Sequence, residues 1–192
     1  MKSKAIAARL VAVSLGILSL AIPASAAPDF ELTFPQEAEV TEFTSSWGAA
    51  RAGHSHKGND LMAPKLTEVY AAADGVVVWI RDRGSAGRYI AIDHGDGWET
   101  WYMHLNNDTP GTDDGAAPLE AGVAVRVGDR VKAGQVIGWV GDSGNAEGSS
   151  SHTHFELHYN GSPIDPYPYL IDAFERALRQ TEPAPHSIFS PI

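Results

Sequence analysis

Short apolar runs alternate with turn-forming residues along most of the chain. The runs are rich in Val, Ile, Tyr and Trp, and Gly- and Asp-containing segments such as Asp74-Gly75 and Gly141-Asp142-Ser143-Gly144 separate them. Runs of this length between turn signals are typical of β-strands. The pattern predicts strands at residues 69–72, 75–81, 89–94, 99–105, 135–140 and 153–159.

One segment has helical spacing instead. Between residues 169 and 180 the apolar positions recur every three or four residues, and the run follows a break at Pro166 and Pro168. Such spacing is expected when one face of a helix packs on a core. The sequence therefore predicts a mainly β protein with one short C-terminal helix, followed by a flexible Pro-rich tail at residues 181–192.

Two further segments differ from the regular strands. Residues 128–138 hold regularly placed glycines and predict a hairpin similar to that of biotinyl and lipoyl carrier domains, for which we expect a structural role because glycines permit tight turns. Residues 106–122 are polar and poor in apolar side chains, which predicts a long surface loop. Because this loop directly follows His104, we hypothesise that it borders the substrate groove.

The first residues have the layout of a secretory signal. Lys2, Lys4 and Arg9 precede an apolar run from Leu10 to Ile22, and the small residues 24–26 follow it. The run is shorter than the ~20 residues that span a bilayer. We therefore expect residues 1–26 to be a cleaved signal peptide, residues 27–180 to form one domain, and the protein to act outside the cytoplasm, in the cell wall or periplasm.

Charge and cysteine content narrow the choice of function. The chain has 14 basic and 24 acidic residues, and three of the basic residues lie in the expected signal, which leaves a net charge of −13. Such a protein is not expected to bind nucleic acid or, once the signal is removed, a membrane. It contains no cysteine. An exported domain of this kind cannot use disulfides, so it depends on its core and on any metal it binds.

The histidines suggest a metal site. His152 and His154 lie at positions i and i+2 of a predicted strand and so project from one face. His56 and Asp60 are four residues apart, and Gly58 between them can bend the chain so that both side chains reach one ion. Two imidazoles and a carboxylate are a common ligand set for catalytic zinc. Short His motifs also arise by chance, so spacing alone leaves a structural role open.

A resemblance to a known family resolves this ambiguity. The segments that carry it are Thr44-Ser45-Ser46-Trp47-Gly48, His56-Lys57-Gly58-Asn59-Asp60, Ala63-Pro64, 69–76, Ile92-Asp93-His94-Gly95, 100–105, 128–138, Gly141-Asp142-Ser143-Gly144, 152–157 and Pro163-Ile164-Asp165-Pro166. In this order they resemble the lysostaphin/LytM family of bacterial zinc endopeptidases. The resemblance extends from about residue 40 to about residue 170.

The resemblance implies specific roles. It implies an antiparallel β-sheet groove or sandwich of the LytM (duplicated hybrid motif) type, with Zn²⁺ held by His56, Asp60 and His154. It implies that His104 and His152 are catalytic and that the substrates are peptides of peptidoglycan. A monomer is expected. The sequence departs from the family pattern at Leu66-Thr67-Glu68-Val69 and at Thr153, and it has no tyrosine at 49–53, where some members have one.

Two alternatives are weighed against this reading. A non-catalytic relative that activates other wall hydrolases would keep the fold but lose metal ligands, whereas every implied ligand is present here. A biotinyl- or lipoyl-type carrier would need a modifiable lysine at a hairpin tip, and the turn at 142–145 has none. The sequence does not identify which peptidoglycan bond is cut.

Overall fold

The computed structural model describes residues 28–51 and 53–181. The predicted signal peptide at 1–26 and the predicted tail beyond Thr181 lie outside the described residues.

Most strands belong to one antiparallel sheet. Its order is β11-β10-β7-β6-β5-β8, and β3 pairs with β10 at one end. These strands are β3 (Asn59–Met62), β5 (Gly75–Asp82), β6 (Arg88–Gly95), β7 (Trp98–Leu105), β8 (Arg130–Val131), β10 (His152–Tyr159) and β11 (Ser162–Ile164). A second, two-stranded sheet joins β4 (Glu68–Tyr70) to β9 (Val136–Trp139), and a hairpin joins β1 (Ala50–Arg51) to β2 (His54–Ser55).

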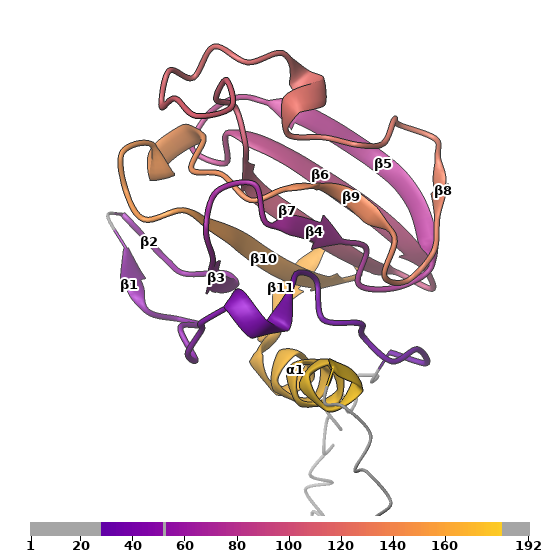
Figure 1. Ribbon diagram of the computed structural model, residues 1–192. Helices are drawn as coiled ribbons and strands as arrows, with labels where there is room; N and C mark the ends of the chain where they lie inside the picture. The colour runs from indigo at the N-terminus through magenta and orange to yellow at the C-terminus, as the bar shows by residue number, and fades with distance from the viewer. Residues whose placement is uncertain (1–27, 52, 182–192) are drawn as a thin grey trace, which may run out of the picture.

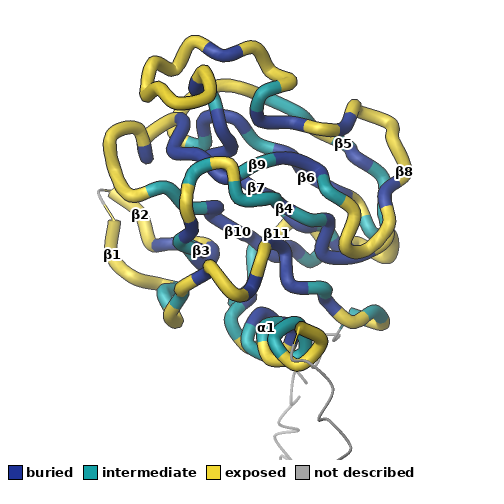
Figure 2. Tube along the Cα trace, in the orientation of Figure 1, coloured by how far each residue is buried: buried dark blue, intermediate teal, exposed yellow. Residues whose placement is uncertain are grey.

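The core lies between the large sheet and the β4–β9 pair (Figure 1). Side chains alternate between the two faces of each strand, so one face of β6, β7 and β10 buries its residues completely. That face includes Ile90, Tyr102 and Phe155, and β4 and β9 contribute Val69 and Ile137; all five side chains are fully buried. Figure 2 shows the buried trace through the centre of the molecule and exposed loops around it. The other face of the sheet is therefore left to carry the functional side chains.

The helix α1 (Tyr167–Thr181) packs below the sheet against the N-terminal segment (Figure 1). Phe174 lies edge-on to Phe34 and Phe43, with ring centroids 5.0 and 5.3 Å apart, and Leu170 is fully buried. Three short 3₁₀ helices, η1 (Ala38–Val40), η2 (Leu119–Ala121) and η3 (Gly144–Ala146), lie in the connections. Within the described part of the chain, no helix is long and apolar enough to cross a membrane.

The predicted strands and the helix are present with small shifts at their ends, and the mainly β fold class is confirmed. The prediction of a hairpin at 128–138 is wrong. Val131 in β8 pairs with β5 of the large sheet, whereas β9 pairs with β4 of the small one. The chain turns between them at Gly134, whose φ is +77°, and so passes from one layer to the other. The short strands β1, β2, β3, β8 and β11 carried no periodic signal and were not predicted.

Candidate metal centre and cleft

Two adjacent strands bring the three implied metal ligands together. Asp60 in β3 lies directly opposite His154 in β10 in the antiparallel register, and His56 precedes β3. Asp60 Oδ1 lies 3.0 Å from His56 Nε2 and 2.9 Å from His154 Nδ1, and the two nitrogens are 2.8 Å apart. Three potential ligand atoms therefore converge on one point, although His56 and His154 are separated by 98 residues.

Gly58 allows this convergence. The chain bends there, as expected from the sequence, but Gly58 does not have a positive φ. A Cβ at this position would collide with the Phe155 carbonyl oxygen and would lie 2.9 Å from His154 Nε2. Glycine is required because the backbone before β3 passes closely over β10, which brings His56 against His154.

The hydrogen bonds fix which ring nitrogens face inward. His56 Nδ1 lies 2.9 Å from the Ser46 carbonyl oxygen, which can only accept, so Nδ1 carries the proton and Nε2 presents a lone pair. His154 Nε2 lies 3.0 Å from the Glu156 carboxylate and donates to it, so in the neutral imidazole Nδ1 also presents a lone pair. With the Asp60 oxygen, three acceptor atoms face one another. Such a group requires a cation among its members.

The pKa shifts of His154 and Asp60 also indicate that the group requires a cation. Burial by itself lowers the pKa of His154, but hydrogen bonds to the carboxylates of Asp60 and Glu156 raise it by more, to about 8. Burial raises the pKa of Asp60, yet its contacts with His154 and His56 hold it far below its ordinary value. The site thus favours positive charge at its centre, supplied either by a proton or by a metal ion.

This donor set fits zinc. Two imidazole nitrogens and one carboxylate oxygen are ligands that zinc accepts, and among residues 28–51 and 53–181 no fourth side chain closes the group. The Glu156 carboxylate also accepts from His158 Nε2 at 2.6 Å, which holds it against the far side of His154. A carboxylate in this position orients a ligating imidazole and raises its basicity.

The two further histidines implied as catalytic lie beside this group. The ring centroid of His104 is 5.0 Å from that of His152 and 6.1 Å from that of His154. His104 Nδ1 donates to the Ser143 carbonyl, and His152 Nδ1 donates to the Ser150 carbonyl, both at 2.8 Å. In its neutral form each imidazole therefore has its lone pair at Nε2, where it can accept a proton.

His104 has both an unusual pKa and an unusual backbone conformation. Burial lowers its pKa, and the neighbouring His152 and His154 act in the same direction, so that the pKa falls to about 4 despite the hydrogen bond to Ser143. Its φ is +62°, a left-handed conformation that costs a non-glycine residue about 1–3 kcal/mol and often occurs at functional sites. The imidazole is thus neutral near pH 7 and fixed in orientation.

These side chains line an open cleft with a volume of about 680 Å³. The β1–β2 hairpin supplies Arg51 and His54 on one side, and Ser85, Ala86 and the segment 145–149 form another wall. The loop at 106–122 contributes no described residue to this lining. It lies behind the wall, where Asn107 Nδ2 donates to Glu147 Oε2 at 3.2 Å.

The remaining histidines have different surroundings. His94 lies between the Asp74 carbonyl and Thr100 Oγ1, each 2.8 Å from a ring nitrogen, and burial lowers its pKa; these contacts indicate a structural role. His158 stacks on Trp101 with ring centroids 4.5 Å apart. His186 lies outside the described residues.

Sequence reasoning missed several residues of the site. Glu156 continues the alternation of His152 and His154 along β10, so the spacing i, i+2, i+4 was a usable signal for it; the same spacing places His158 on this strand face, at the edge of the site. The carbonyl groups of Ser46 and Ser143, which fix the tautomers of His56 and His104, carry no signal in the side-chain pattern.

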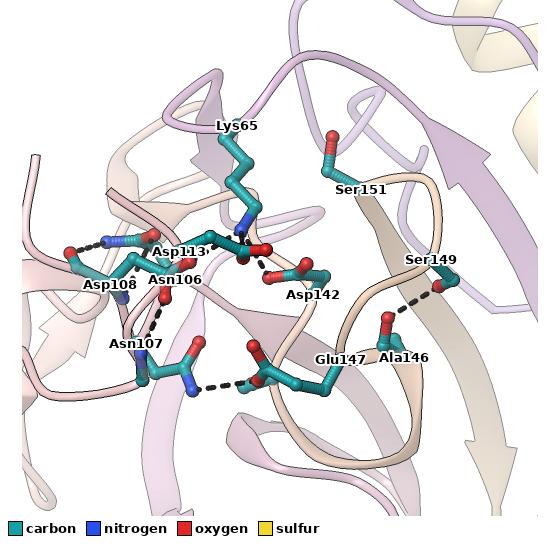
Figure 3. Close-up of polar contacts among 12 residues, drawn as sticks. Lys65, Asn106, Asn107, Asp108, Asp113, Asp142, Ala146, Glu147, Ser149 and Ser151 are labelled. Atoms are coloured by element: carbon teal, nitrogen blue, oxygen red, sulfur yellow. Dashed lines mark hydrogen bonds and ion pairs between the residues drawn. The ribbon is translucent and has the colours of Figure 1, made fainter. Parts of the chain in front are cut away.

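A second group of carboxylates lies around Lys65, next to the segment 146–149 (Figure 3). Oxygens of Asp108, Asp113 and Glu147 lie within 4.8 Å of one another. Here the chain supplies its own cation, because Lys65 Nζ lies 2.6 Å from Asp108, 2.5 Å from Asp113 and 2.8 Å from Asp142. The carboxylates of Asp108 and Asp142 are almost completely buried. Lys65 thereby ties the 106–122 loop to the segment that carries Ser143.

We expect Lys65→Met to destabilise the protein by about 3 kcal/mol, because removing one partner leaves buried carboxylates unpaired. Urea unfolding of both proteins measures this difference in the free energy of unfolding. Lys132→Met is the matched control: its ammonium pairs with Asp74 at 2.6 Å, but both side chains are exposed, so little change is expected. Equal effects of the two substitutions would contradict the assignment.

The same variant should alter the pH dependence of stability. Burial raises the pKa of Asp108, but Lys65 and the Gly115 amide lower it by more, so the folded pKa lies below the ordinary value of about 3.9. The stabilisation that the ionised Asp108 carboxylate gains from these contacts is fully present above its ordinary pKa. It is lost as the pH falls through the folded pKa. The difference in unfolding free energy between wild type and Lys65→Met should therefore narrow below about pH 4.

Comparison with known proteins places these features in context. A family model described as "Peptidase family M23" matches residues 54–166. The chain is 36% identical over 110 residues to the peptidoglycan DD-endopeptidase ShyA of Vibrio cholerae, a match that covers 57% of this chain and 22% of ShyA. The chain therefore spans about a fifth of the length of such curated relatives.

Solved structures are also similar. A zinc-containing peptidase from Vibrio cholerae has a TM-score of 0.58 and 26% identity, covering 70% of this chain and 39% of that one. The catalytic domain of the antimicrobial peptidase lysostaphin from Staphylococcus simulans has a TM-score of 0.55 and 29% identity, covering 68% of this chain and 92% of that one.

Proposed function

Since this chain belongs to peptidase family M23, we propose that it is an exported zinc endopeptidase that hydrolyses peptide bonds in the cross-links or stem peptides of peptidoglycan. The observation that carries the proposal is the convergence of three potential ligand atoms from His56, Asp60 and His154 beside the imidazoles of His104 and His152. Relatives described as peptidoglycan endopeptidases support the choice of substrate.

The reaction needs a metal and a proton acceptor. When bound at this centre, zinc would polarise the scissile carbonyl and lower the pKa of a water molecule. Either His104 or His152 would take a proton from that water at its Nε2 lone pair, because its Nδ1 is committed to a backbone carbonyl. The other imidazole would stabilise the charge that develops on the substrate. Glu156 would hold His154 in place throughout.

The test combines metal content with activity. We expect the protein purified without residues 1–26 to hold about one zinc per chain and to release new peptide termini from purified peptidoglycan, detected by mass spectrometry. Chelation should abolish this release and lower the melting temperature, because a ligand of the folded state stabilises it, and added zinc should restore both.

Two outcomes would count against the proposal. Activity that persists after exhaustive chelation and verified metal loss would exclude the zinc mechanism. A folded protein that holds no zinc and digests none of several peptidoglycans of different cross-link chemistry would favour a non-catalytic relative.

A further inference from the structure

We propose that Arg51 forms a carboxylate-binding subsite beside the metal centre, which selects peptides that carry a carboxylate next to the scissile bond. The inference rests on the proposed function, because it assigns a substrate group to the same cleft. It starts from the position of the guanidinium. Arg51 Nη2 lies 2.7 Å from Asp60 Oδ2, while the other oxygen of that carboxylate faces His56 and His154.

The hairpin that carries Arg51 is tied to the metal centre. Arg51 in β1 pairs with His54 in β2, and the His56 amide donates to the Ala49 carbonyl at 2.8 Å. The Gly48 amide in turn donates to the His56 carbonyl at 2.9 Å. The hairpin projects at the edge of the molecule next to β3 (Figure 1). Its backbone thus fixes where the guanidinium enters the cleft relative to the ligand His56.

The guanidinium keeps most of its hydrogen-bonding capacity. An arginine has five N–H donors, and among the described residues Arg51 uses one group, Nη2, in its bond to Asp60. Its side chain is 42% exposed, compared with 22% for Asp60 and 5% for His56. A guanidinium that has free donors and lies at a cleft rim is suited to bind a carboxylate through two parallel hydrogen bonds.

The cleft offers an anion cationic side chains, whereas its carboxylates already have partners. The lining contains two carboxylates, and both are already bound: Asp60 by His56, His154 and Arg51, and Glu156 by His154 and His158. Apart from its histidines, the lining has two basic residues, Arg51 and the exposed Lys57. In a chain with a net charge of −10, these two exposed side chains offer an anion cationic N–H donors at the rim of the cleft.

In a peptide substrate the carboxylate can come from two sources. It is either the C-terminal carboxylate of the residue next to the scissile bond or a side-chain carboxylate of that residue. Matched synthetic peptides distinguish them: one pair differs only in a C-terminal carboxylate or carboxamide, and a second pair differs only in a side-chain carboxylate or carboxamide. The kcat/KM ratio of acid to amide is measured within each pair.

We expect wild type to prefer the acid by about tenfold to a hundredfold in one pair, the scale of a charged hydrogen-bonded contact. In Arg51→Gln that ratio should fall to near one, and in Arg51→Lys it should be intermediate. The control is Arg126→Gln, which removes the same charge from an exposed arginine outside the cleft and should keep the wild-type ratio. Zinc content is measured for each variant.

Three results would overturn the inference. Wild type that cleaves acid and amide equally in both pairs has no such subsite. An Arg51→Gln variant that keeps the preference shows that another group recognises the carboxylate. If Arg51→Gln loses zinc, and its kcat/KM on the acid and on the amide falls by the same factor as its zinc content, then Arg51 only orients Asp60. If wild type cleaves none of these peptides or peptidoglycan, the proposed function fails as well, which is a separate outcome.

Discussion

Replacing His56, Asp60 or His154 by alanine is expected to empty the metal centre and abolish peptide hydrolysis. Each substitution removes one of the three atoms that converge there, and among the described residues no other His, Asp or Glu side chain belongs to this group. His152 Nε2 lies 3.9 Å from Asp60 Oδ1, but His152 is not part of the group whose ligand atoms all lie within 4.8 Å of one another. A zinc ion held by two protein ligands would dissociate in dilute solution.

The measurement is metal content per folded chain together with hydrolysis of peptidoglycan. Circular dichroism verifies that each variant is folded. His94→Ala is the matched control, because it removes a buried imidazole that contacts Asp74 and Thr100 instead of the metal centre. It should keep zinc and lose activity only as far as it loses stability. A His154→Ala variant with full zinc occupancy would refute the assignment.

Replacing His104 or His152 by alanine is expected to leave zinc in place and reduce turnover by roughly a hundredfold to ten-thousandfold, the range for a general acid–base group. Both imidazoles use Nδ1 to contact a backbone carbonyl and keep Nε2 for proton transfer. The effect should therefore appear in kcat and not in metal affinity.

His104→Ala needs one additional control. The left-handed conformation of His104 at the end of β7 is strained for any side chain with a Cβ. His104→Gly removes the imidazole and relieves that strain. The glycine variant should be at least as stable as the alanine variant, and it should be equally inactive. If His152→Ala emptied the centre while His154→Ala kept its zinc, the roles of the paired histidines would have to be exchanged.

The largest structural correction concerns how distant segments are connected. The glycine-rich stretch at 128–138 has the pattern of a hairpin, but its two strands join different layers because each finds a partner from elsewhere in the chain. The pattern of turns specifies where the chain reverses. It does not specify which strand lies alongside, since that depends on which apolar faces are buried together.

The loop at 106–122 illustrates the same limit. Its composition predicts a surface loop, and its position after His104 suggested that it borders the groove. The structure instead holds it behind the cleft wall, through Lys65 and Glu147. Any influence on substrate choice is thus indirect, through the segment around Ser143 that orients His104.

The sequence by itself determined the family, the mainly β fold class, the principal strands, the helix and the residues that meet at the centre. The two-residue repeat of side chains along a strand placed His152 and His154 on one face. The order of the motifs identified His56, Asp60 and His104. These features are local or carried by motifs, so a linear pattern contains them.

Only the tertiary structure determined which atoms meet at the metal centre and where the charged groups lie around it. The antiparallel register sets Asp60 against His154, the close approach at Gly58 brings in His56, and backbone carbonyls choose which ring nitrogens face inward. The hairpin places Arg51 on the outer oxygen of Asp60. None of this appears in a side-chain pattern, because hydrogen bonds and burial depend on which distant segments the packed core brings into contact.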